Sequence, residues 1–157
     1  MQLAAALGAC GFMLQGHDGP PWVDRGRVAL VGVRQLDEGE KRFIRENELC
    51  VLTMEDIDRR GIASVLNEAL VVVQGAGFVH LSLDVDVCDP EIAPGVGTPV
   101  RGGLSYREAH LAMELVAEAG LLSSLEVVEV NPTLDHVNAT ADLAVELVVS
   151  AMGASIL

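Results

Sequence analysis

Residues 80–90 read HLSLDVDVCDP, an apolar strand pattern that ends in three carboxylates. Side chains alternate across a strand, so Asp84 and Asp86 are predicted to share one face. Because two neighbouring carboxylates repel each other, a bound cation, a shared proton or a solvated strand end must offset the repulsion. Ligands of open α/β sheets bind at the carboxyl ends of strands. This position favours metal ligation, with a solvated strand end or helix capping as the alternatives.

Apolar runs of strand length alternate with helical patterns along the chain. Strands are predicted at 27–33, 49–53, 78–85 and 125–130, and helices at 1–6, 36–46, 53–73, 105–120 and 140–152. Two of the helices open with capping boxes, Thr53 with Asp56 and Ser105 with Glu108. This alternation predicts an α/β fold of three layers, α/β/α, in which helices cover both faces of a mainly parallel sheet.

Other acids lie where a charge needs an explanation. Glu129 is near the end of an apolar strand, where it either has a partner or caps the next turn. Asp37 and Glu40 follow another strand end and fit a solvated first helical turn. Residues 87–103 hold three prolines and four glycines, and loops of this length in compact domains are usually functional.

Composition limits the functional classes. The 157 residues fit one domain, and ten basic against 23 acidic residues give a net charge of −13. This balance argues against nucleic acid or an anionic membrane as partner and favours a cationic substrate or a metal ion. Three cysteines without C-x-x-C spacing indicate reduced thiols. Because residues 1–14 lack a basic region, neither a signal peptide nor a membrane span is expected, and a cytoplasmic location is predicted.

Four separated motifs resemble the C-terminal half of arginases, members of the ureohydrolase family. They occur in the family's order and cover essentially the whole chain, so residues 1–157 are identified as the C-terminal part of such a domain. The forms of the third and fourth motifs are closer to arginase than to agmatinase. The motifs are SLDVD with DP (82–86, 89–90), PGVGTP (94–99), GGLSYRE (102–108) and EVNP (129–132).

The resemblance implies hydrolysis of L-arginine to L-ornithine and urea at two manganese ions that ionise a bridging water. It also implies a homo-oligomer, a trimer or hexamer, with Arg107 and Glu108 near the subunit contacts. The residue roles that it implies are metal ligation by Asp84 and Asp86, orientation of the guanidinium by Glu129, a place beside the reacting end for Thr98, and recognition of the α-amino group by Asp37 and Glu40.

Part of the family's metal site is missing from this sequence. Its G-G-D-H and D-x-H-x-D motifs, and the histidine proposed as proton shuttle, do not occur here. Because two carboxylates alone make a weak metal site, the chain is expected to be a fragment that is inactive alone and exposes an unpaired sheet edge. Two alternatives stay open: agmatinase or another guanidino hydrolase, and a non-catalytic ureohydrolase-like subunit.

Overall fold

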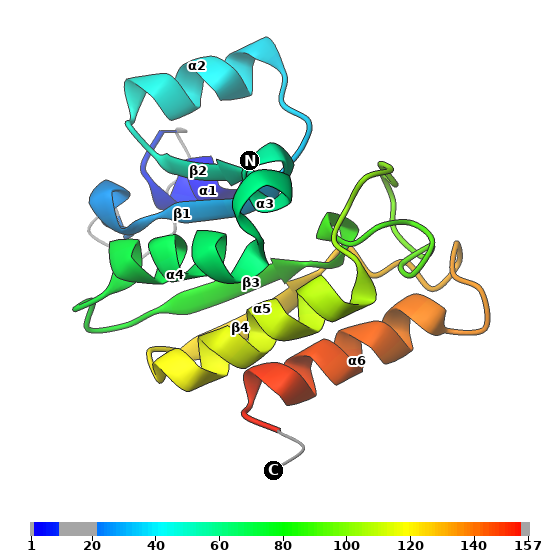
Figure 1. Cartoon of the computed structure of the whole chain (residues 1–157). Helices are drawn as coiled ribbons and strands as arrows, with labels where there is room; N and C mark the ends of the chain where they lie inside the picture. The colour runs from blue at the N-terminus through cyan, green and yellow to red at the C-terminus, as the bar shows by residue number, and fades with distance from the viewer. Residues whose placement is uncertain (1, 10–21, 155–157) are drawn as a thin grey trace, which may run out of the picture.

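The computed structural model describes residues 2–9 and 22–154 (Figure 1). It has the α/β composition that the sequence predicts. In chain order the elements are α1 (Gln2–Ala6), the 3-10 turn η1 (Arg25–Arg27), β1 (Ala29–Val33), α2 (Glu38–Glu46), β2 (Cys50–Thr53), α3 (Met54–Arg60), α4 (Ile62–Val73), β3 (His80–Asp84), the 3-10 turn η2 (Val85–Val87), α5 (Tyr106–Ala119), β4 (Ser124–Val128) and α6 (Ala139–Ala151).

The four strands form two parallel pairs. β1 pairs with β2, with Ala29 opposite Cys50, and β3 pairs with β4, with His80 opposite Ser124. Within the described residues no ladder of hydrogen bonds joins β1 to β3. The predicted parallel pairing is confirmed, but the strands do not form one continuous sheet.

The two faces of the β3–β4 pair differ in chemistry. Leu81 and Leu83 point into the main core, whereas His80, Ser82 and Glu126 are exposed on the opposite face. His80 Nδ1 lies 2.7 Å from Ser124 Oγ, and His80 Nε2 lies 3.4 Å from Glu126 Oε1. The helical layer expected on this outer face is not found among the described residues.

The helix predicted from Thr53 to about Val73 is wrong in one respect. The capping box of Thr53 with Asp56 is present, but the segment forms two helices, α3 and α4, separated by Gly61. Gly61 has φ 78° and ψ 150°, a conformation that interrupts a helix and that glycine adopts without a steric penalty. The other predicted capping box, Ser105 with Glu108, opens α5 as expected, and α5 ends at Gly120.

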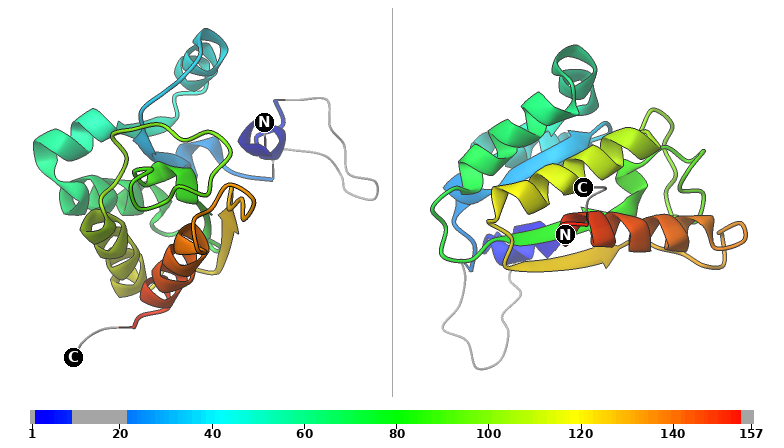
Figure 2. Two further views of the ribbon diagram at one scale, coloured as in Figure 1. Left: turned by 90° about the vertical axis from the view of Figure 1, so that its right-hand side faces the viewer. Right: turned by 60° about the horizontal axis from the view of Figure 1, so that its bottom comes forward.

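The helical layer is continuous where the sheet is not. α4 packs against β1, α5 packs against α4, and α6 packs against α5. Figure 2 shows these three helices on the same side of the strands. Their buried side chains, including Leu66, Met113 and Leu147, form one core with residues of β2 and β3. Helix packing therefore holds the two strand pairs beside each other. No helix in residues 2–9 and 22–154 has the length and apolar character of a membrane span.

Candidate active site

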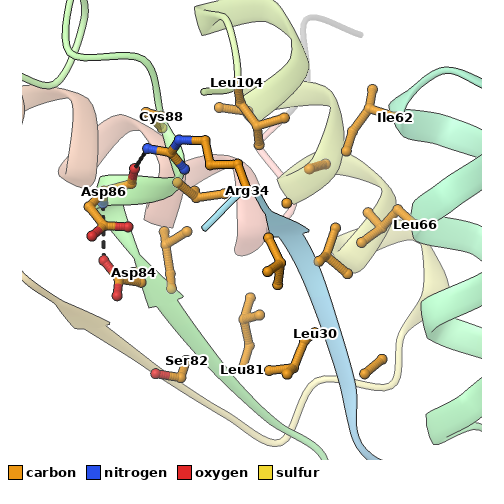
Figure 3. Close-up of a pocket in the computed structure, with 18 of the residues that line it drawn as sticks. Leu30, Arg34, Ile62, Leu66, Leu81, Ser82, Asp84, Asp86, Cys88 and Leu104 are labelled. Carbon is orange, nitrogen blue, oxygen red and sulfur yellow. Dashed lines mark hydrogen bonds between the residues drawn. The ribbon is translucent and has the colours of Figure 1, made fainter. Parts of the chain in front are cut away.

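The carboxylates of residues 80–90 meet where β3 ends, but not in the way that the alternation predicts. The strand stops at Asp84, and Val85–Val87 forms a 3-10 turn, so Asp86 is not on a strand face. In this turn the backbone N–H of Asp86 donates to Asp84 Oδ1 at 3.0 Å. Figure 3 shows the two side chains one above the other at the edge of a pocket. The turn, and not the pleat, brings the two carboxylates together.

The Asp84 carboxyl lies in an unfavourable place for a negative charge. Burial raises its pKa above the ordinary 3.8, and the charges of Asp86 and Glu129 raise it further. The hydrogen bond from the Asp86 N–H and the charge of Arg34 oppose that shift only in part. A proton or a cation beside Asp84 would relieve the repulsion.

Arg34, the residue after β1, ties the end of β1 to this turn. Its Nη2 donates to the carbonyl oxygen of Asp86, and its Nη2 and Nε donate to the carbonyl of Val100 at 2.9 and 3.2 Å. No motif in the sequence predicts this role of Arg34. The only sequence signal is a basic residue directly after a buried apolar strand.

The long loop that follows is fixed near both of its ends by one acid, Asp89. Its carboxylate accepts the N–H groups of Gly102 at 2.8 Å and Gly103 at 3.3 Å, and that of Glu91 at 3.0 Å. These hydrogen bonds lower the pKa of Asp89. Gly103 passes so close to Cys88 that an added Cβ would lie 2.5 Å from the Cys88 carbonyl oxygen. The loop is therefore closed at its base.

A second anchor fixes the middle of the loop. The Gly95 N–H donates to Oγ1 of the buried Thr140 at 2.7 Å, and that hydroxyl donates to Asp135 Oδ1 at 2.9 Å. The Gly95 carbonyl accepts the Asn131 N–H at 2.8 Å. Between the two anchors the Thr98 hydroxyl donates to Asp86 Oδ2 at 3.2 Å. The loop thus holds Thr98 against the carboxylate turn.

Glu129 lies just beyond β4 and not within the strand predicted at 125–130, because β4 ends at Val128. Its φ is 67°, a conformation that is uncommon outside glycine and that is concentrated at functional sites. A Cβ built on Gly97 would lie 3.7 Å from Glu129 Oε2, so its carboxylate faces the loop that carries Thr98. Its charge also acts on Asp84. The structure therefore holds Thr98 on Asp86 and places Glu129 near enough to Asp84 for its charge to act there, but Glu129 is exposed and does not line the pocket.

Asp37 and Glu40 have a structural role in this conformation. Asp37 is the N-cap of α2, and each carboxylate accepts the backbone N–H of the other residue at 2.8 Å. Glu40 also lines the pocket, together with Arg34 and Gln35. Glu40 is therefore part of the pocket lining, whereas Asp37 is not.

Asp84 and Asp86 line a cavity of about 600 Å³ between β1 and β3, together with Thr98 and Glu40. Carboxylate oxygens suit Mn²⁺ and Mg²⁺ in kind. However, no group of three or more His, Cys, Asp or Glu side chains in the described part of the chain could hold a metal ion. Asp84 and Asp86 are suitable donors but too few to complete a centre.

Known proteins resemble this chain over nearly its whole length. A family profile described as "Arginase family" matches residues 12–153. The chain belongs to the arginase family. The arginase of Bacillus subtilis is 49% identical over 158 residues, which cover 100% of this chain and 53% of that protein. The arginase of Bacillus caldovelox is 51% identical, over 98% of this chain and 52% of that protein.

Solved structures of arginases superpose closely on this chain. The crystal structure from Bacillus subtilis gives a TM-score of 0.94 at 49% identity, with 100% of this chain and 56% of that one covered. A structure described as a hypothetical agmatinase from Burkholderia thailandensis gives 0.68 at 31% identity, over 82% of this chain and 38% of that one. The chain spans about half the length of the curated arginases that it matches.

Proposed function

We propose that residues 1–157 form one part of an arginase-type hydrolase that converts L-arginine and water to L-ornithine and urea. The pairing of Asp84 with Asp86 at the end of β3, with the charge of Glu129 acting on Asp84, carries this proposal, and membership of the arginase family supports it. In the proposed reaction water adds to the guanidinium carbon, the bond from that carbon to the chain nitrogen breaks, and a proton passes to the leaving amine.

In this proposal, some of the acidic residues bind metal and another binds the substrate. Asp84 and Asp86 would hold manganese, with further ligands from outside the described residues. Two Mn²⁺ ions, when bound, would act as Lewis acids and would lower the pKa of a bound water molecule to near neutrality. Glu129 would orient the cationic guanidinium through charge-assisted hydrogen bonds. Thr98, fixed on Asp86, would lie beside the reacting end of the substrate.

The α-amino end of the substrate would be recognised by residues at the start of α2. Glu40 lines the cavity, and Asp37 is joined to it by the capping box. We assign the α-amino group of arginine to this pair, because carboxylates accept charge-assisted hydrogen bonds from an ammonium group. The proposed protein works in the cytoplasm as a homo-oligomer.

A chimeric chain tests this function without relying on association of separate pieces. It joins the part of Bacillus subtilis arginase that this chain does not match to residues 1–157, in the relative's order. Manganese-dependent urea release from L-arginine is expected, with much slower release from agmatine. Glu129→Gln should lower kcat/KM by about 100-fold or more, since it removes a charged hydrogen-bond acceptor from the transition state.

Glu55→Gln is the matched control, because Glu55 is an exposed residue of α3. It should leave urea release unchanged. A folded, manganese-loaded chimera that releases no urea would overturn the proposal. That result would favour a non-catalytic ureohydrolase-like subunit. The observation that supports this alternative is that the described residues contain no group of three or more possible metal ligands.

A further inference from the structure

The first turn of α6 is attached to the two segments that carry Thr98 and Glu129. Thr140 lies in this turn, and its exposed fraction is 0%. Its hydroxyl accepts the N–H of Gly95, three residues before Thr98, at 2.7 Å, and donates to Asp135 Oδ1 at 2.9 Å. One buried hydroxyl therefore joins the helix to the loop.

The direction of these hydrogen bonds follows from the chemistry of Asp135. Burial alone would raise the pKa of this carboxyl, but hydrogen bonds from Thr140, Ala141 and His136 outweigh that effect and lower it. An ionised carboxylate can only accept, so the Thr140 hydroxyl gives its one proton to Asp135 and offers a lone pair to Gly95. Because Gly95 is buried, its N–H would lose its partner if that hydroxyl were removed.

Gly95 extends this restraint to the segment that follows β4. Its carbonyl accepts the Asn131 N–H at 2.8 Å, and the next residue, Val96, forms an antiparallel bridge with Val130. Both contacts lie within two residues of Glu129, whose φ is 67°. A non-glycine backbone in this region costs free energy and persists only where the surrounding structure holds it. The contacts of the loop with this segment supply that support.

Apolar contacts join the same helix to the carboxylate turn. Ala144 is four residues after Thr140 and therefore lies on the same face of α6. It belongs to one buried cluster with Val96 of the loop and with Val85, the first residue of η2. The start of α6 thus contacts the turn and the loop, and through the loop it is connected to the segment of Glu129.

We propose that Thr140 is a positioning residue, whose hydroxyl acts through Gly95 to fix Thr98 and Glu129 relative to the carboxylate turn. Thr140 does not line the cavity, so it acts through the loop and not on the substrate. The inference rests on the proposed function, in which Glu129 orients the guanidinium and Thr98 lies beside the reacting end. Small displacements of groups that position a substrate can lower turnover strongly.

Two substitutions separate the hydroxyl of Thr140 from its size. Thr140→Val keeps the branched shape and removes the hydroxyl, whereas Thr140→Ser keeps the hydroxyl and removes the methyl group. Thr53→Val is the control for lost stability, because the Thr53 hydroxyl caps α3 and Thr53 lies outside the cavity lining. All three variants are made in the 157-residue chain and in the chimera with the unmatched part of Bacillus subtilis arginase.

Hydrogen–deuterium exchange of the 157-residue chain measures the junction without any need for activity. Thr140→Val should speed exchange about tenfold or more at the amides of Gly95 and Asn131, which donate within the junction. Thr140→Ser and Thr53→Val should stay within about threefold of the unsubstituted chain. Unchanged exchange in Thr140→Val would overturn the inference, and so would equal acceleration in Thr140→Ser.

Urea release by the chimera measures the consequence for the reaction. Thr140→Val should lower kcat for L-arginine by about 10- to 100-fold with a smaller change in KM, because the start of α2, assigned to the α-amino end, is fixed by its own capping box. Thr140→Ser should restore kcat to within about threefold, and Thr53→Val should leave it unchanged. An equal loss of kcat in Thr53→Val would indicate a general loss of stability and would contradict the inference.

The two measurements distinguish the two proposals. An unsubstituted chimera that releases no urea would refute the proposed function. The exchange rates of the 157-residue chain would still decide whether the Thr140 hydroxyl holds the loop and the Glu129 segment together. An active chimera whose kcat is unaffected by Thr140→Val would refute the positioning role and leave the proposed function intact.

Discussion

Two guanidinium nitrogens of Arg34 donate to the carbonyl of Val100, 66 residues further along the chain, at 2.9 and 3.2 Å. The same Nη2 also donates to the carbonyl of Asp86. One side chain therefore sets the distance between the carboxylate turn and the loop that carries Thr98. This fork geometry needs a planar guanidinium and cannot be reproduced by an ammonium group.

Arg34→Lys should lower the free energy of unfolding by about 1–3 kcal/mol, because it removes charged hydrogen bonds to two carbonyl groups. Urea denaturation followed by circular dichroism measures the change. Arg59→Lys is the control, since Arg59 forms an exposed pair with Glu55 and should change stability by less than about 0.5 kcal/mol. Equal stability of both variants would show that Arg34 does not hold the loop.

Asp84→Asn should raise the Tm of the metal-free chain at pH 7. Burial, with the charges of Asp86 and Glu129, raises the pKa of Asp84 in the folded state. A carboxyl with a raised pKa favours folding at low pH, and this contribution is lost as the pH rises through the folded pKa. Asparagine does not ionise, so the variant does not lose this stability as the pH rises. The gain should be below about 4 °C, because the group is half exposed.

Thermal unfolding between pH 4 and pH 8 checks this dependence. The difference between Asp84→Asn and the unsubstituted chain should shrink as the pH falls toward 4, where aspartate becomes protonated in both folded and unfolded chains. Glu91→Gln, an exposed carboxylate beyond the turn, is the control and should give a small difference at every pH. A lower Tm for Asp84→Asn at pH 7 would contradict the repulsion described here.

Gly103→Ala should destabilise the chain by about 1–3 kcal/mol, because its Cβ would collide with the backbone of Cys88. The collision also displaces the N–H that donates to Asp89. Gly77→Ala is the matched control, since a Cβ there meets no atom within 4 Å. Chemical denaturation of the two variants gives the comparison. Similar loss in both would mean that the close approach at Gly103 is not needed.

The Cys88 thiol should resist modification in the folded chain. Burial raises its pKa to about 11 from the ordinary 9.0, which lowers the thiolate fraction about 100-fold at pH 8. A Cys10→Ser, Cys50→Ser variant isolates this thiol for reaction with an aromatic disulfide reagent. The reaction should be at least about 100-fold slower in buffer than in denaturant. Fast reaction in the folded chain would disprove the burial of Cys88.

Local signals in the sequence predicted much of the fold. The two capping boxes and the end of α5 at Gly120 lie where the residue pattern indicates. These features depend on hydrogen bonds between residues three or four apart, which a single sequence displays directly. The split at Gly61 was missed because an isolated glycine within a helical pattern is also tolerated in helices.

The acidic residues of the site could be predicted from the sequence, but the residues that hold them in position could not. The D-x-D pattern and the family resemblance indicate Asp84, Asp86, Thr98 and Glu129. The first three line the pocket and the charge of Glu129 acts on Asp84, while their chemical roles stay predictions. Arg34 was missed because it binds backbone carbonyls, which carry no sequence signature. The link from Thr140 to Gly95 was missed for the same reason, and its partners lie 45 residues apart.

The interrupted sheet also governs how the molecule unfolds. The β1–β2 and β3–β4 pairs communicate through α4 and α5, with no ladder between them in the described residues. Units that share few hydrogen bonds open separately, each with its own local stability. We therefore expect the β1–β2 pair and the β3–β4 pair to unfold as two separate units, joined by the apolar contacts of α4 with α5. The contact between α4 and α5 therefore determines how far the opening of one strand pair spreads to the other.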